Sequence, residues 1–303
     1  MSRYEIDMST LPLRAVILDN DETTGSYGIL FAILHHLREQ EGLTSEYIQR
    51  TLKRLAYWMM SHGLFRPGLR KLLSVLINLR NVGALDAIIM YTNQSEVIPP
   101  KGVHEFLYSP PKCIQYMFSY LMTQQVFDHM LTRPNHGKSL PGGWHVKQFK
   151  RVLDLYPDKP LNMSGLLFLD DLAQQPYIQT TGIPKSGVFQ SSYFRVTPYK
   201  RFLSAKDVFE CLLHVFTVDN MTHEFMDDVY KTYITTYAPN ESSTPNGYML
   251  MLASEQIQKK YGFISEKLQP MFLQKQCLNP LQSSEIDNDG VNKSSEINEG
   301  TSE

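Results

Sequence analysis

The sequence AVILDNDETTGSYG, residues 15–28, places a short apolar run directly before three acidic side chains within four positions. The run, extended to residues 14–19, is rich in branched side chains, as strands buried on both faces of a parallel sheet are. A carboxylate at the end of such a strand is costly to bury unless it has a cation, hydrogen-bond donors or a chemical task. The stretch therefore predicts a first strand over residues 14–19 that ends in a functional site.

The composition is that of an ordinary globular protein. The 303 residues suffice for one large domain or two small ones. The net charge of −2 gives no overall field that would attract nucleic acid or an anionic membrane, so we expect neither as a partner. Three separated cysteines without CxxC spacing, no signal-peptide pattern and no apolar run of about 20 residues predict a soluble, intracellular protein, cytoplasmic or nuclear.

Strands and helices alternate after the first strand. Apolar runs predict further strands over 85–94, 126–134 and 164–171. Helical spacing with start and stop signals predicts helices over 26–40, 44–63, 66–83, 110–125 and 142–156. Because each separation is long enough for a crossover, the pattern favours an α/β fold with a mostly parallel sheet and helices on both faces, a three-layer Rossmann-like arrangement.

The last third of the chain has a looser pattern. Residues 182–200 predict loop with one short strand, and residues 201–280 predict a helical C-terminal extension that begins with a pair of helices over 204–237. Residues 281–303 have almost no large apolar side chains and are predominantly acidic, so we expect a disordered acidic tail.

Polar side chains follow three of the predicted strands. In an open parallel sheet, ligands bind outside the carboxyl ends of the strands, so these side chains should meet in one crevice. They are Asp19 and Asp21 after the first strand, Thr92 and Asn93 after the second, and Asp170 and Asp171 after the last. Lone aspartates after a strand often only cap a helix, but carboxylates in this number suit Mg²⁺, which keeps positions for water and phosphate. With a lysine and a threonine as donors to phosphate oxygens, the set predicts phosphoryl transfer.

Several segments, in order, resemble the haloacid dehalogenase-like (HAD) superfamily. DNDET, residues 19–23, fits the DxDxT signature, and DETTGSY, residues 21–27, looks like the DLDETL form of the C-terminal-domain phosphatase branch. That branch includes small phosphatases that act on phosphoserine in RNA polymerase II tails. Further segments are similar to its later motifs: FRPGLRKLL (65–73), IIMYTNQS (88–95) and LLFLDDLAQQP (166–176). The resemblance covers roughly residues 14–180 and implies a HAD fold.

The resemblance also implies roles for individual residues. Asp19 would be the nucleophile that forms an aspartyl-phosphate, Asp21 the general acid and base, and Thr92 a ligand of the transferring phosphoryl group. Lys147 is the first choice for the charge-neutralising lysine and Lys138 its rival. The resemblance implies that Mg²⁺ is bound by Asp19, the backbone carbonyl of Asp21 and Asp171. Asp170, next to this metal site, would orient the lysine. Further substrate contacts would come from Thr23, Asn93 and Lys138.

The sequence departs from the branch at two places. Asn20 replaces an apolar residue between the aspartates, and Thr24 stands where the branch has leucine. About 65 residues separate the first and second motifs, which suggests a small helical cap inserted over the site. Its basic residues, Arg66 among them, are interpreted as a solvated helix face, with contact to an anionic substrate as the alternative. The expected division is a catalytic core over 1–25 and 84–200, a cap over 26–83, the extension over 201–280 and the tail over 281–303.

The function expected from these observations is a magnesium-dependent phosphatase. The resemblance implies a phosphoserine or phosphothreonine protein as the substrate. A small phosphorylated metabolite or nucleotide is the alternative, favoured by the cap. A non-catalytic protein that keeps the fold and binds a partner is a further hypothesis, with Asn20 and Thr24 as its support.

Overall fold

The computed structural model describes most of the chain between residues 12 and 262. The described residues are 12–40, 42–95, 104–133, 147, 149–160, 163–172, 189–190, 192–216, 222–240 and 248–262. The predicted tail, the end of the predicted extension and Lys138 lie outside the described residues.

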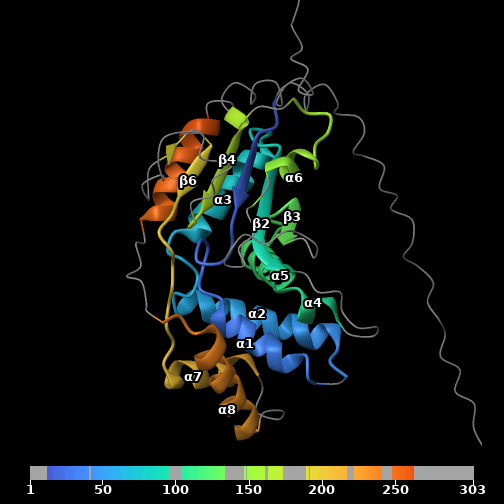
Figure 1. The fold of residues 1–303 in the computed structure, drawn as a ribbon, viewed down its shortest axis with the longest axis vertical. Coiled ribbons are helices and arrows are strands. Elements are labelled where there is room, and N and C mark those ends of the chain that lie inside the picture. The colour runs from blue at the N-terminus through green and yellow to red at the C-terminus, as the bar shows by residue number, and fades with distance from the viewer. Residues whose placement is uncertain are drawn as a thin grey trace, which may run out of the picture.

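A six-stranded sheet forms the centre of the molecule, in the spatial order β3-β2-β1-β4-β6-β5 (Figure 1). Five of the strands are parallel, and β5 alone pairs antiparallel, with β6 at the edge. The strands are β1 (Ala15–Leu18), β2 (Ala87–Ser95), β3 (His129–Arg133), β4 (Leu166–Asp170), β5 (Phe189–Gln190) and β6 (Tyr193–Arg195). The expected parallel α/β sheet is confirmed, while the single short strand expected over 182–200 is wrong, because two short strands form there.

Strand β1 lies between β2 and β4, and its four residues are all buried. Leu18 is level with Met90 of β2 and with Leu169 of β4. Because side chains alternate along a strand, Val16 and Leu18 enter one hydrophobic cluster while Ala15 and Ile17 enter another on the opposite face. Burial on both faces explains why this run carries no polar residue.

Helices cover both faces of the sheet. Helix α6 (Phe149–Leu153) packs on the face of Ile17 through Val152. Helices α3 (Leu69–Asn81) and α5 (Pro110–Met122) contribute to the cluster on the other face, as does a helix over residues 249–262. The short elements α4 (Glu105–Tyr108) and η2 (Met163–Gly165) precede α5 and β4.

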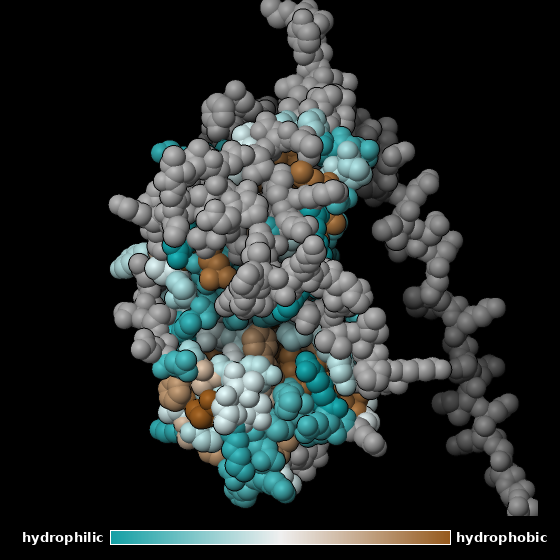
Figure 2. Space-filling model, viewed as in Figure 1, coloured by the Kyte–Doolittle hydropathy of each residue, from teal (hydrophilic) through white to brown (hydrophobic). Residues whose placement is uncertain are grey.

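A further group of helices lies beyond the carboxyl ends of the strands, at the bottom of Figure 1. It consists of α1 (Gly28–Leu37), α2 (Ser45–Ser61), α7 (Ala205–Val215), α8 (His223–Thr232) and the π-helix η5 (Tyr233–Tyr237). The side chains of Thr44 and Ser204 cap α2 and α7. The tip formed by α8 is predominantly hydrophilic, as Figure 2 shows. We call this group the helical layer.

The helical layer and the sheet share one hydrophobic cluster. Leu55 of α2, Ile88 of β2 and Val208 of α7 all belong to it. The predicted division into core, cap and extension therefore runs through continuous packing, and it stays a prediction. Among the described residues, no helix combines the length and the apolar character that crossing a bilayer requires.

Close packing of α1 against η5 depends on a glycine. A Cβ atom on Gly28 would lie 2.7 Å from the carbonyl oxygen of Tyr237, nearer than side-chain carbons approach backbone. We expect Gly28→Ala to lower the free energy of unfolding by about 1–3 kcal/mol, because the backbone of η5 must move. Urea denaturation measures the change. His223→Ala, at the exposed first residue of α8, is the control, and an equal effect of the two substitutions would show that the contact is not tight.

Candidate active site

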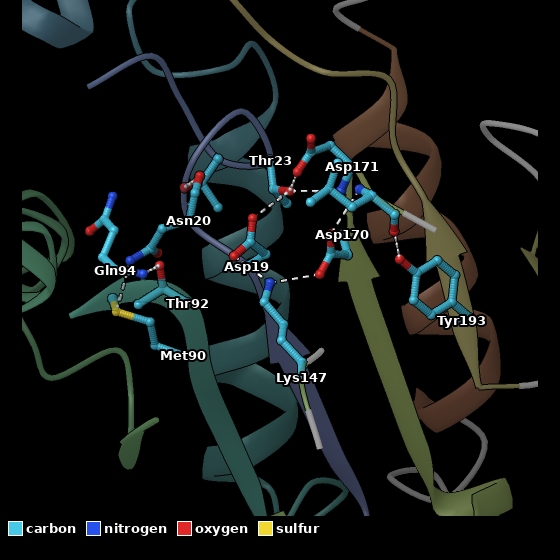
Figure 3. A network of polar contacts seen from close by, with 12 residues as sticks. Asp19, Asn20, Thr23, Met90, Thr92, Gln94, Lys147, Asp170, Asp171 and Tyr193 are labelled. Atoms are coloured by element: carbon cyan, nitrogen blue, oxygen red, sulfur yellow. Dashed lines mark hydrogen bonds and ion pairs between the residues drawn. The ribbon is translucent and has the colours of Figure 1, made fainter. Parts of the chain in front are cut away.

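A buried lysine lies between two aspartates at the carboxyl ends of β1 and β4 (Figure 3). Lys147 Nζ forms a short ion pair with Asp19 Oδ1 and a second with Asp170 Oδ2 at 2.6 Å. The lysine side chain is 1% exposed, and its ammonium also lies 5.6 Å from the centre of the Phe168 ring. The sheet register explains the meeting, because residues 19 and 170 directly follow the paired Leu18 and Leu169.

A third carboxylate completes the cluster through a threonine. The Thr23 hydroxyl oxygen lies 3.1 Å from Asp171 Oδ1 and 3.3 Å from Asp19 Oδ2, and it accepts the backbone N–H of Asp171 at 3.0 Å. One carboxylate oxygen of each of Asp19, Asp170 and Asp171 lies within 4.8 Å of the others. Three buried oxygen ligands at this spacing are a donor set that suits a divalent cation such as Mg²⁺.

The charges of the cluster do not balance. Burial would lower the pKa of Lys147, but Asp170 and Asp19 raise it further than burial lowers it, so the lysine stays charged. Burial, with the charges of Asp19, Asp170 and Glu22, raises the pKa of Asp171 to about 9. Burial also raises the pKa of Asp170, although Lys147 opposes the rise. Near neutral pH Asp171 therefore keeps its proton, and one ammonium against the other two carboxylates leaves negative charge that a bound cation would stabilise.

Asp21 lies apart from this cluster, on the loop that follows β1. Desolvation by the surrounding protein, then the charges of Asp19 and Glu22, raise its pKa to about 7. By accessible area, however, the residue is exposed. Solvent therefore screens part of the repulsion that Asp19 and Glu22 exert on Asp21. A raised pKa at an accessible carboxyl is a property of groups that exchange protons near neutral pH.

Arg66 holds the loop in place, a role that the sequence did not suggest. The interpretation of Arg66 as part of a solvated helix face is wrong, because only 2% of the residue is exposed. Its guanidinium donates to the carbonyl oxygen of Glu22 at 2.6 Å and to that of Thr197, and its backbone N–H donates to Thr24. Glu22 adopts the left-handed conformation, with φ of 57°, and the bond from Arg66 stabilises this turn.

The residues at the end of β2 lie on the other side of Asp19. Thr92 is buried, and its hydroxyl accepts the backbone N–H of Gln94 at 3.2 Å. Asn20 donates to the sulfur of Met90 at 2.9 Å, and Asn93 is half-buried. Figure 3 shows Thr92, Met90 and Gln94 on the opposite side of Asp19 from Asp170 and Asp171. No hydrogen bond among the described residues joins Thr92 to the carboxylates.

Comparison of the chain with protein-family models and with curated proteins gives no match. The resemblance to the HAD superfamily therefore depends on the motif residues themselves. The structure brings together Asp19, Thr23, Lys147, Asp170 and Asp171, which come from three separate segments.

We expect Mg²⁺ to stabilise the protein through the three carboxylates. At a magnesium concentration 100 times the dissociation constant, the free energy of unfolding should rise by about 2.7 kcal/mol. Asp171→Asn should remove most of this gain because the variant loses one of the three charged ligands. Thermal melts with and without Mg²⁺ measure it, with Asp227→Asn at an exposed position of α8 as the control. An equal response of both variants would exclude this site.

We also expect the stability of the metal-free protein to depend on pH because Asp171 binds and releases a proton. A carboxyl whose pKa is raised in the folded state holds its proton more tightly there than in the unfolded chain. The folded state therefore loses stability as the pH rises from about 4 towards about 9. Asp171→Asn removes this loss, so the variant should gain stability relative to the native chain between about pH 6 and about pH 8.5. Urea denaturation in a chelator measures it, and a difference independent of pH would contradict the assignment.

Proposed function

We propose that the protein is a magnesium-dependent phosphatase of HAD type that hydrolyses a phosphomonoester through an aspartyl-phosphate. The observation that carries the proposal is the buried pairing of Lys147 with both Asp19 and Asp170, beside Asp171. A structural ion pair needs one carboxylate for one ammonium. Two further acids, buried at the carboxyl edge of a parallel sheet, favour a site built for a cation and a phosphate.

The chemistry assigned to Asp19 and Asp21 balances in two steps. A carboxylate oxygen of Asp19 forms a bond to phosphorus while the bond from phosphorus to the ester oxygen breaks, and Asp21 gives its proton to the departing oxygen. Asp21 then takes a proton from water as the water oxygen bonds to phosphorus. This second step releases inorganic phosphate and restores the Asp19 carboxylate. The raised pKa of Asp21 suits a group that must give and then take a proton.

The remaining residues hold charge in place. Lys147 would neutralise part of the phosphate charge, and its bond to Asp170 fixes the direction of the ammonium. Asp19 and Asp171, with the backbone carbonyl of Asp21 implied by the resemblance, would hold Mg²⁺. Bound Mg²⁺ would lower the repulsion between a phosphate dianion and the acidic cluster. Thr92 would donate its hydroxyl to a phosphate oxygen.

The two departures from the branch do not weaken the proposal. Thr24 donates to the backbone carbonyl of Asn20 and shares a hydrogen bond with the Tyr27 hydroxyl, each at 2.8 Å. The Asn20 amide is directed to Met90. Both side chains thus have contacts within the loop and the neighbouring strand, and neither lies among the three clustered carboxylates. A non-catalytic binding protein stays the alternative hypothesis.

Two substrate classes are compatible with this chemistry. The resemblance implies a phosphoserine or phosphothreonine protein, and the alternative is a small phosphorylated metabolite or nucleotide. The helical layer lies beyond the strand ends (Figure 1), and this position favours a small substrate over a large one.

Hydrolysis of p-nitrophenyl phosphate by the full chain tests the proposal. We expect turnover that requires Mg²⁺, and Asp19→Asn should lower kcat by about 10³-fold or more because the amide is a poor nucleophile. Asp227→Asn should keep the native rate. Turnover that survives in folded Asp19→Asn would contradict the assigned nucleophile, and no turnover of any phosphomonoester would contradict the proposed function.

A further inference from the structure

A pocket of about 320 Å³ lies next to the end of β2, between the sheet and the helical layer. This volume is at the lower end of the range for small-molecule sites. Its walls include Phe31, Tyr108 and Tyr237, with Arg38 and Gln94. These side chains come from α1, the ends of α4 and η5, and β2, so the pocket exists only where the helical layer meets the sheet.

The aromatic walls suit a flat ligand. The rings of Phe31 and Tyr237 lie edge to face with centroids 5.8 Å apart. The Arg38 guanidinium lies 5.2 Å from the centre of the Tyr108 ring, and its Nε donates to the carbonyl of Leu107. No described carboxylate forms an ion pair with Arg38. Aromatic rings and an arginine plane are the surfaces on which nucleobases stack in proteins.

One of the polar groups that line the pocket is the carboxamide of Gln94. Neither Nε2 nor Oε1 of Gln94 has a hydrogen-bond partner among the described residues, although both atoms are buried. Buried polar atoms are nearly always paired, so unpaired ones beside a pocket indicate a partner that arrives from outside. A carboxamide offers one donor and one acceptor side by side, which matches the adjacent donor and acceptor of a base such as adenine.

The distance between Gln94 in the pocket and the candidate nucleophile Asp19 is one that a single nucleotide can span. Asp19 follows Leu18, which is level with Met90, so Gln94 lies three residues beyond the position opposite Asp19. At about 3.3 Å per residue, this is about 10 Å along the neighbouring strand. The phosphate of a nucleotide at Asp19 and its base at Gln94 would be separated by the sugar. Figure 3 shows Gln94 beside Thr92, on the side away from Asp171.

We propose that this pocket binds the base of a nucleoside 5′-monophosphate, so that nucleotides are the substrate class of the site. The hydrolysis of the nucleotide rests on the proposed function. The recognition of its base rests on the pocket alone. Gln94 would pair with the edge of the base, and Tyr108 with Arg38 would stack on its face.

Kinetics with the full chain and Mg²⁺ test the inference. The substrates are adenosine 5′-monophosphate, ribose 5-phosphate, which lacks the base, and a phosphoserine peptide. We expect kcat/KM for the nucleotide to exceed that for the sugar phosphate by about 10-fold or more. Gln94→Leu should remove most of this preference, so that kcat/KM for the nucleotide falls toward that for ribose 5-phosphate measured with the same variant. Gln258→Leu is the matched control, because Gln258 lines a separate groove between α3 and the helix over 249–262.

Equilibrium binding separates the failure of this inference from the failure of the proposed function. Calorimetry with the Asp19→Asn protein compares the nucleotide with ribose 5-phosphate without any turnover. Tighter nucleotide binding that Gln94→Leu abolishes supports the pocket even if no phosphomonoester is hydrolysed. Equal binding of the two ligands by the unmodified pocket overturns the inference. Preference for the peptide, with the nucleotide no better than the sugar phosphate, overturns it while the proposed phosphatase stands.

Discussion

The buried ammonium of Lys147 is the constraint on which the arrangement of the site depends. It is paired with Asp19 after β1 and Asp170 at the end of β4, so both carboxylates must stand level with each other. The register of Leu18 with Leu169 provides this. A slip of one residue would turn these side chains to opposite faces of the sheet and leave a buried charge without a partner, which is far costlier than the loss of an exposed ion pair. The apolar strands and the polar site therefore require the same register.

The loop after β1 couples the site to the helical layer. Arg66 precedes α3, yet its guanidinium bonds to the backbone of Glu22 and of Thr197, which joins three segments distant in sequence. Gly25 forms a bridge with Phe65 next to it. The position of Asp21 is consequently fixed by contacts with the beginning of α3, and not by the sheet alone.

Much of the sheet and of the carboxylate cluster could be predicted from the sequence, for a physical reason. Strands buried on both faces tolerate only apolar residues, so β1 and β4 can be recognised in the sequence as apolar runs. The polar residues at the ends of these runs can be recognised for the same reason. Asp19, Asp170 and Lys147 were predicted on that basis and through the resemblance. Arg66 was not, since helical periodicity does not distinguish a buried arginine from a solvated one. The two-residue strand β5 is too short to leave a period in the sequence.

The pocket beside Gln94 could not be predicted, because its walls come from α1, β2, α4 and η5 and no local pattern connects them. Its place relative to the carboxylates has a consequence for an anionic substrate. One side of Asp19 holds Asp171 and also Asp170, whose negative charge would repel a phosphate dianion until a cation is bound. Among the residues that the structure describes, the walls of the pocket hold no acidic side chain, and they include the charge of Arg38. If the proposed function holds, a phosphate substrate would meet less repulsion from the pocket side than from the side of Asp170, so the group that it carries would lie toward the aromatic walls.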